Sequence, residues 1–183
     1  MILRVISGTK RGLKLESLDG LDTRPTLDRV KESIFSMIFD MPYDAKVLDL
    51  FAGSGGMGIE ALSRGSRSAV FVDKSAQACA VVRNNIRKSG FEDKSAVVNT
   101  DSADYIQKAS HSGEFFDIIF LDPPYGPDIL TETLAQIHKA GILAEGGVIV
   151  VESDNGTDVD IQNYKLLKDK RYGRVCINIL EAQ

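Results

Sequence analysis

The stretch VLDLFAGSGGMG, residues 47–58, decides the fold. An apolar run of strand length, residues 47–51, leads into a glycine-rich turn, and a helical pattern begins at Met57. Glycine allows positive φ angles and lets a ligand approach the backbone closely. In open α/β sheets a ligand binds beyond the carboxyl ends of the strands, at a turn of this kind. The stretch therefore predicts a nucleotide-binding turn in an α/β domain.

Downstream of this turn the hydrophobic pattern alternates between strands and helices. Apolar strands that are separated by helices indicate a parallel sheet covered on both faces. The last two predicted strands form a hairpin, which inserts an antiparallel strand at one edge. We therefore predict an α/β fold with a doubly wound, mostly parallel, seven-stranded sheet of the Rossmann-like type. Its strands are expected at 47–51, 69–72, 96–99, 116–121, 148–151, 164–168 and 175–180, and its helices at 57–63, 75–88, 102–109 and 128–140, the last capped by Asp128.

The first 40 residues do not follow this alternation. Two short apolar runs, at 3–6 and 12–15, flank a glycine-bounded turn and predict a β-hairpin with Lys10 and Arg11 at its tip. Apolar residues at helical spacing between Leu27 and Ile38 predict a helix after the hairpin. We therefore divide the chain into an N-terminal extension, residues 1–40, and a main domain, residues 41–183.

Length and composition are those of a single globular domain. The 183 residues are 43% hydrophobic and 26% charged, and no apolar run reaches the roughly 18 residues that a membrane span needs. The N-terminus lacks the pattern of a signal peptide, so we expect a cytoplasmic protein with no membrane partner. Cys79 and Cys176 form no CxxC pair and are interpreted as reduced core thiols. No Cys/His cluster indicates a metal site, and Asn84 and Asn85 are interpreted as polar residues on a helix surface.

The net charge of −4 conceals two basic segments. Residues 1–31 carry seven basic and four acidic side chains, and the segment 165–174 carries five basic side chains against Asp169 alone. Charge runs of this kind are usually solvated loops. They also fit a pair of patches that contact phosphates and bind nucleic acid in a salt-dependent way. Charge alone leaves both interpretations open.

Two aspartates bear on the ligand that the turn holds. Asp73 ends the second predicted strand, 20 residues after Gly53, where a carboxylate can accept both hydroxyl hydrogens of a ribose. This position fits NAD and S-adenosylmethionine equally, and the GxGxxG pattern of residues 53–58 is a weak signal by itself. Asp49 separates the two cofactors, because a carboxylate at the turn opposes a pyrophosphate and attracts the ammonium group of S-adenosylmethionine.

The tetrapeptide DPPY, residues 122–125, follows the predicted strand 116–121. Its two prolines fix the backbone and remove two N–H donors, which leaves carbonyl oxygens as acceptors at the edge of the sheet. An exocyclic amino group of a base is a poor nucleophile, because its lone pair is delocalised into the ring. Asp122 and the Pro123 carbonyl can accept its two hydrogens and direct the lone pair at a methyl donor, while Tyr125 offers a face for stacking the base. The tetrapeptide therefore predicts methylation of an amino group.

Together these motifs resemble the class I S-adenosylmethionine-dependent methyltransferases that act on amino groups. The segments RVISG (4–8), TRPTLDRVKESIF (23–35), LDLFAGSG (48–55) and EALSRG (60–65) are similar to the RsmD family of bacterial 16S ribosomal RNA guanine-N2 methyltransferases, over nearly the whole chain. The resemblance implies that S-adenosylmethionine, which becomes S-adenosylhomocysteine, is bound by Asp49, Phe51, Gly53, Ser54, Gly55, Asp73, Lys74, Asp101 and Ser102. It also implies that Asp122, Pro123 and Tyr125 are catalytic and that Arg4, Lys10, Arg11, Arg24 and Arg29 bind RNA.

The leading interpretation is methyl transfer to the N2 amino group of one guanine in 16S rRNA, within the small ribosomal subunit or an assembly intermediate. The enzyme is expected to be a monomer that uses no metal. Three alternatives stay open. A DNA adenine-N6 methyltransferase uses the same acceptor groups, and an NAD-dependent oxidoreductase explains GxGxxG and Asp73 but not DPPY. A non-catalytic RNA-binding assembly factor retains the pocket without turnover.

Overall fold

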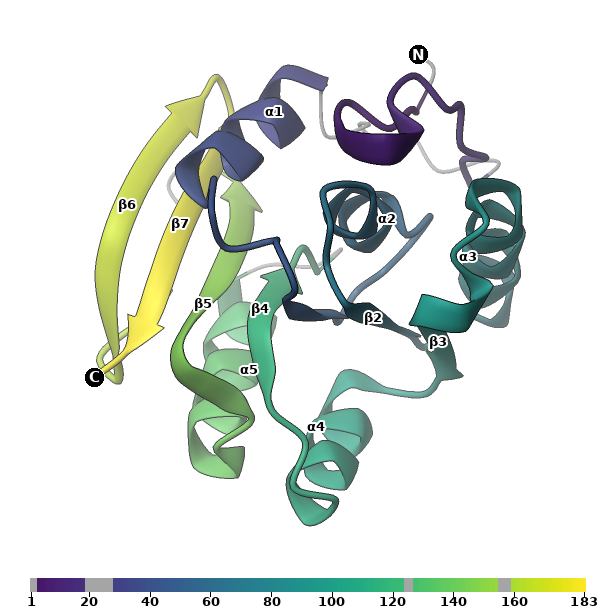
Figure 1. Cartoon of the computed structure of the whole chain (residues 1–183). Helices are drawn as coiled ribbons and strands as arrows, with labels where there is room; N and C mark the ends of the chain where they lie inside the picture. The colour runs from purple at the N-terminus through teal and green to yellow at the C-terminus, as the bar shows by residue number, and fades with distance from the viewer. Residues whose placement is uncertain (1–2, 19–27, 124–126, 155–158) are drawn as a thin grey trace.

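Seven strands form one sheet in the computed structural model, which describes residues 3–18, 28–123, 127–154 and 159–183 (Figure 1). The strands are β1 (Lys46–Asp49), β2 (Ser68–Asp73), β3 (Ser95–Asn99), β4 (Phe116–Leu121), β5 (Leu143–Asp154), β6 (Tyr164–Tyr172) and β7 (Val175–Ala182). The helices are α1 (Asp28–Met37), α2 (Gly56–Ser63), α3 (Ala76–Ser89), α4 (Ser102–His111) and α5 (Pro127–Ala140), with 3₁₀ turns η1 (Gly8–Lys10) and η2 (Glu92–Lys94). No helix in the described ranges is long and apolar enough to cross a membrane.

The order of the strands across the sheet is β3-β2-β1-β4-β5-β7-β6. Strands β1 to β5 are parallel to one another, because a helix connects each of them to the next. Strand β7 is antiparallel to both of its neighbours and lies between β5 and β6. The sheet is therefore doubly wound and mostly parallel, with an antiparallel strand inserted at one edge, which confirms the predicted fold class.

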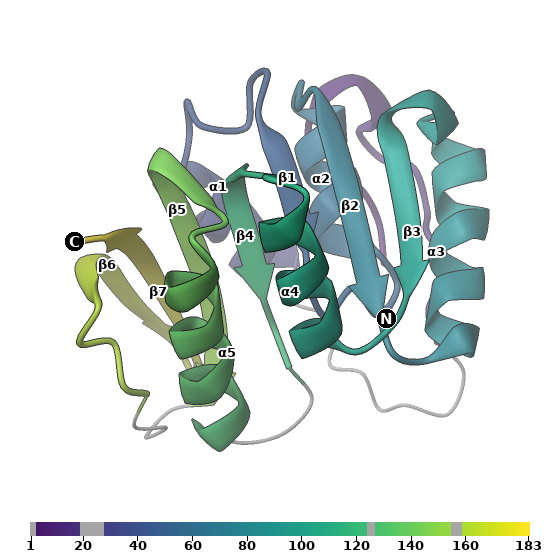
Figure 2. The ribbon, with the colours of Figure 1, turned by 90° about the horizontal axis from the view of Figure 1, so that it is seen from below.

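Helices cover both faces of the sheet. Helices α1, α2 and α3 pack on one face, and α4 and α5 pack on the other, as two separate apolar clusters (Figures 1 and 2). On the first face the ring of Phe35 in α1 lies against that of Phe120 in β4, with centroids 5.8 Å apart. Along β4 only Asp117 is not fully buried, as expected for a strand that is covered on both sides.

Several element boundaries differ from the prediction; β1, for example, ends at Asp49 and not at residue 51. Helix α5 begins at Pro127, so Asp128 lies in its first turn and is not its cap. Proline suits the first position of a helix, because its φ is already helical and no N–H is lost from the hydrogen-bond pattern. Strands β5 and β6 are also longer than predicted. At their carboxyl ends, pairing with β7 continues through polar residues that carry no strand pattern, and at the start of β5 Leu143 pairs with Phe116 of β4.

The predicted N-terminal hairpin is present with less regular pairing than expected. Its two arms pair through Val5 N–H to Leu13 O, at 2.9 Å, and through a single antiparallel bridge between Arg4 and Lys14. No strand forms in residues 3–18, because the next two amides, of Ile6 and Ser7, donate to a side chain of α2. The segment is nevertheless fixed to the domain, since Val5 and Leu15 are part of the core under α1 and α2.

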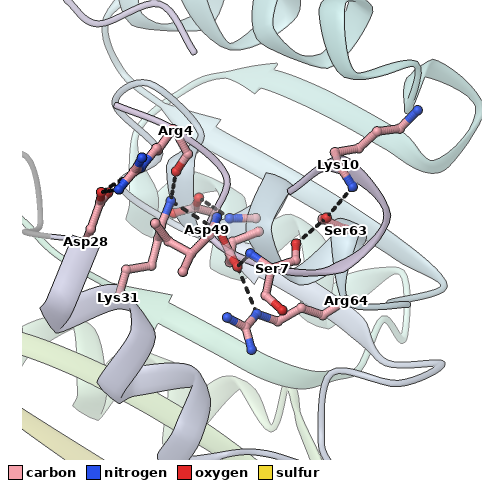
Figure 3. Close-up of polar contacts among 11 residues, drawn as sticks. Arg4, Ser7, Lys10, Asp28, Lys31, Asp49, Ser63 and Arg64 are labelled. Carbon is pink, nitrogen blue, oxygen red and sulfur yellow. Dashed lines mark hydrogen bonds and ion pairs between the residues drawn. The ribbon is translucent and has the colours of Figure 1, made fainter. Parts of the chain in front are cut away.

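Glu60 of α2 is the acceptor for those two amides. Its fully buried carboxylate accepts the Ile6 and Ser7 N–H groups at 2.7 and 3.0 Å and the Arg64 Nε–H at 2.9 Å. It also forms an ion pair with the buried ammonium of Lys31 in α1, at 3.3 Å (Figure 3). Burial lowers the pKa of Lys31, and the negative charge of Glu60 opposes that shift. Glu60 thus joins the N-terminal segment, α1 and α2 at one point.

We expect the substitution Glu60→Gln to lower the free energy of unfolding by about 3–5 kcal/mol, since it leaves the Lys31 ammonium buried without an anion. Chemical denaturation monitored by circular dichroism measures this loss. The matched control is Glu132→Gln, the same change on the exposed surface of α5, which we expect to stay within about 0.5 kcal/mol. If Glu60→Gln lowers the free energy of unfolding by less than about 1 kcal/mol, Glu60 does not stabilise the contact between the N-terminal segment, α1 and α2.

Candidate active site

The glycine-rich turn joins β1 to α2, as the sequence predicts. Gly55 is the N-cap of α2 and has a φ of +79°, a conformation that favours glycine. Gly58 lies in the first turn of α2, where an added Cβ would be 2.3 Å from the ring of Phe71 in β2. Only glycine at position 58 therefore lets α2 pack this closely on the sheet and begin directly beside the end of β1.

Asp49 ends β1 and is buried beneath this turn. Its Oδ2 accepts the Gly58 N–H at 3.0 Å, and the side chain is almost entirely shielded from solvent. Burial raises the pKa of Asp49 to about 7; the hydrogen bond from Gly58 opposes the rise, and the negative charges of Asp122 and Asp73 add to it. A buried carboxylate with anionic neighbours is stabilised by a cation.

Asp73 ends β2 and is linked to the same turn. Its Oδ2 accepts the Gly53 N–H at 2.9 Å, and its Oδ1 accepts the Ser75 N–H at 2.8 Å. The carboxylate therefore connects the turn after β1 with the start of α3. Lys74, the next residue, is exposed at the same edge of the sheet. Each carboxylate oxygen of Asp73 keeps a second lone pair for a ligand hydroxyl.

The other predicted cofactor residues lie at neighbouring strand ends. Phe51 and Ser54 follow β1 and are half-buried in the turn. Asp101 follows β3 and caps α4, with its Oδ1 accepting the Ala103 N–H at 2.9 Å, and Ser102 is the first residue of that helix. The structure thus brings the predicted cofactor residues together along the carboxyl edge of β1, β2 and β3.

Asp122 and Pro123 follow β4 at this edge. Although solvent reaches part of the Asp122 side chain, the protein around it removes enough water to raise the pKa of the carboxyl to about 6. The negative charge of Asp154, at the end of β5, adds to this rise. Tyr125, the remaining residue of the predicted catalytic set, lies outside the described residues. The acceptor groups of Asp122 and Pro123 are therefore placed on the same side of the sheet as Asp49.

Asn85 was predicted to be a surface residue, and this prediction is wrong. Its side chain is completely buried, and its Nδ2 donates to the carbonyl of Ser54 at 2.9 Å and to that of Glu16 at 3.0 Å. Its Oδ1 accepts the Glu16 N–H at 2.7 Å. Asn85 therefore attaches the N-terminal segment to the glycine-rich turn. Its spacing of three residues from Val82, on the apolar face of α3, is the sequence signal that indicates burial.

The predicted RNA-binding residues are spread over the N-terminal segment and α1. The Arg4 guanidinium forms an exposed ion pair with Asp28, at 2.7 Å (Figure 3). The Lys10 ammonium lies 5.6 Å from the centre of the Phe91 ring, after α3. Arg11 and Arg29 are exposed. Arg24 lies outside the described residues. Arg4 contacts α1 and Lys10 contacts α2, so these two cations lie over the face of the sheet that both helices cover.

The charge of the site indicates the kind of cofactor that it fits. The carboxylates of Asp49, Asp73 and Asp122 lie at three adjacent strand ends, and the charges of the last two raise the pKa of the first. S-adenosylmethionine brings an ammonium and a sulfonium to such a site, whereas NAD brings a pyrophosphate that these carboxylates repel. The donor set therefore fits S-adenosylmethionine. Within the described ranges no cluster of His, Cys, Asp or Glu side chains is arranged to hold a metal ion.

The fold and this site define a class I methyltransferase. A solved structure titled "Putative methyltransferase yhhF from Escherichia coli" superposes with a TM-score of 0.86 at 30% identity, over 100% of this chain and 99% of that one. The family model "Conserved hypothetical protein 95" matches residues 3–181. The chain is 42% identical to "Putative rRNA methyltransferase YlbH" of Bacillus subtilis, over 99% of this chain and 100% of that protein. It is 33% identical to "Ribosomal RNA small subunit methyltransferase D" of Escherichia coli, over 99% of this chain and 90% of that protein. The chain belongs to this family, the RsmD family.

Proposed function

We propose that this protein transfers a methyl group from S-adenosylmethionine to the N2 amino group of a guanine in 16S ribosomal RNA. The observation that carries the proposal is the position of Asp122 and Pro123 at the sheet edge that also holds Asp49 and Asp73. The names of the relatives, an rRNA methyltransferase and a small-subunit rRNA methyltransferase, support ribosomal RNA as the substrate.

The residues that would hold the cofactor follow β1, β2 and β3 at their carboxyl ends. When bound, S-adenosylmethionine supplies a methyl group on a sulfonium, which is the electrophile of the reaction. Asp49 attracts the ammonium of its amino-acid tail, while the backbone of Gly53, Ser54 and Gly55 holds that tail beside Phe51. Asp73 and Lys74 bind the ribose, and Asp101 and Ser102 lie beside the adenine.

Asp122 and the Pro123 carbonyl prepare the nucleophile. They accept the two hydrogens of the guanine amino group and hold its lone pair toward the methyl group, which supplies orientation and stabilises the positive charge that develops on nitrogen. Tyr125 stacks on the base. The proton released from the amino group passes to Asp122 or to water. A carboxylate with a pKa of about 6 accepts a proton more readily than an ordinary aspartate does.

The target guanine has to leave its stack to reach Asp122, at a cost of a few kcal/mol. The N-terminal extension, residues 1–40, compensates for part of this cost by guiding the RNA through Arg4, Lys10, Arg11, Arg24 and Arg29. Membership of the RsmD family favours the small subunit or an assembly intermediate as the particle that presents the guanine.

Methyl incorporation from labelled S-adenosylmethionine tests the proposal. The substrate is small ribosomal subunits from cells that lack their own member of the family, and the RNA is digested to nucleosides afterwards. We expect labelled N2-methylguanosine. Matched reactions contain naked 16S rRNA and duplex DNA.

Each other outcome selects a different function. Label in DNA adenine supports a DNA adenine-N6 methyltransferase. Binding of the protein to the subunit and to S-adenosylmethionine without transfer of label supports a non-catalytic assembly factor. Binding of NADH, detected by its fluorescence, without binding of S-adenosylmethionine supports an oxidoreductase. Any of these results would overturn the proposal.

A further inference from the structure

Strand β6 carries a concentration of exposed basic side chains outside the site described above. Lys168 donates to the carbonyl of Met37 and so stabilises the C-terminal end of α1. Within the described ranges the other cations of this strand and its turn form no ion pair. The exposed cations of β6 and its turn are Lys165, Lys168, Lys170, Arg171 and Arg174.

The direction of β6 brings its basic end toward the candidate active site. Strand β6 is antiparallel to β7, which is antiparallel to β5, so β6 runs in the same direction as β4. Tyr172, at the end of β6, pairs with Val175, which in turn pairs with Asp154, the residue whose charge acts on Asp122. Three strand spacings separate β4 from β6, a distance of about 14 Å that a few nucleotides of RNA span.

Helix α1 connects this strand with the N-terminal segment (Figure 1). Ser33 of α1 forms a hydrogen bond with the hydroxyl of Tyr172. The helix carries the exposed Arg29 near its start and meets β6 near its end, where Met37, Lys168, Asp169 and Lys170 line a hollow of about 390 Å³. Arg29 therefore lies between the N-terminal segment, which Asp28 contacts through Arg4, and the end of β6, which Ser33 contacts through Tyr172.

We propose that β6 and its turn, through Lys170, Arg171 and Arg174, form a second phosphate-binding surface that holds ribosomal RNA beside the site. The surface fits RNA because unpaired cations along a strand in an otherwise acidic chain match the regular negative charge of a nucleic-acid backbone. The inference rests on the proposed function, since it assumes an RNA substrate.

A different explanation for lysines on an edge strand is protection against pairing with another sheet. That protection requires charge of either sign. Binding of phosphates requires positive charge. Reversal of the charge therefore separates the two explanations, because a glutamate at position 170 still protects the edge but repels RNA.

The test compares two double variants by their KM for small ribosomal subunits and their Kd for the same particles. The first is Lys170→Glu with Arg174→Glu. The control is Lys94→Glu with Lys139→Glu, which makes the same change in net charge at exposed positions that precede β3 and β5, at the opposite edge of the sheet. We expect KM and Kd to rise at least tenfold in the first variant and less than twofold in the control, with unchanged Kd for S-adenosylmethionine in both.

Neutral variants provide a second measurement. In Lys170→Gln with Arg174→Gln, the slope of log Kd against the logarithm of the salt concentration should fall by roughly 1.4, as expected when two contacts with single-strand phosphates are lost.

Equal KM values for the two charge-reversal variants would overturn the inference. Weaker binding with an unchanged salt slope would also overturn it, because β6 then contacts a protein of the particle. The activity of the wild-type protein distinguishes a wrong inference about β6 from a wrong proposed function. The proposed function is wrong only if the wild-type protein itself transfers no methyl group to RNA.

Discussion

We expect replacement of Asp122 by alanine to reduce methyl transfer to the RNA by about 10³-fold or more and to leave the affinity for S-adenosylmethionine within about twofold. Single-turnover incorporation of labelled methyl groups measures the first quantity, and calorimetric titration of the cofactor measures the second. The two effects separate because Asp122 follows β4, whereas the residues assigned to the cofactor follow β1, β2 and β3.

The size of this effect follows from what the carboxylate does. In the proposed mechanism the carboxylate accepts a hydrogen of the amino group in the ground state and meets a developing positive charge in the transition state, so its removal should cost more rate than binding. Asp122→Asn keeps one acceptor oxygen but no negative charge, and we expect a rate between those of wild type and Asp122→Ala. Asp93→Ala, an exposed carboxylate in η2, is the matched control and should retain full activity. Near-wild-type activity of Asp122→Ala would remove Asp122 from the mechanism.

The features that the sequence predicted are local ones. Residues 47–58 contain a strand, a turn and a helix start in one continuous stretch, and the backbone rules for glycine operate within that stretch. Asp73 and Asp122 directly follow predicted strands and Asp49 lies within another, and parallel strands bring their carboxyl ends to one edge. Fold class and the positions of these carboxylates could therefore be obtained without coordinates.

The features that the sequence did not predict depend on contacts between distant segments. Glu60 accepts amides that precede it by more than 50 residues, and Asn85 bonds to Glu16, 69 residues away. The sequence around each of these two residues does not indicate which distant residue its side chain contacts. The full length of β6 was missed for a related reason: residues 169–171 near its end are exposed and charged, and only the ladder with β7 makes them part of a strand.

Asp49→Asn should have opposite effects on stability and on cofactor binding. In the folded protein without cofactor, burial raises the pKa of Asp49 from 3.8 to about 7, so the folded state favours the protonated carboxyl. The stability that this group contributes is complete below pH 4 and is lost as the pH rises through 7. At pH 8 asparagine removes that penalty, and we expect a gain of up to about 4 kcal/mol in the free energy of unfolding, which disappears near pH 4.

Cofactor binding has the reverse dependence on pH. The ammonium of S-adenosylmethionine favours the ionised form of Asp49, so in wild type the affinity should rise by up to tenfold for each pH unit between about 5 and 7. It should then level off and fall above about pH 8, where the amino group of the ligand loses its proton. Calorimetric titration across this range measures the profile, and Asp49→Asn should give weaker binding with no rise. Methylthioadenosine, which lacks the amino-acid tail, is the matched ligand and should bind both proteins with an affinity that does not change with pH.

If Asp49 serves only to accept the Gly58 amide, the two ligands will show the same pH dependence and the Asp49→Asn variant will gain no stability at pH 8. If Asp49→Asn is instead stable and binds methylthioadenosine but not S-adenosylmethionine, the function of the buried Asp49 carboxylate is to bind the ammonium group of the cofactor.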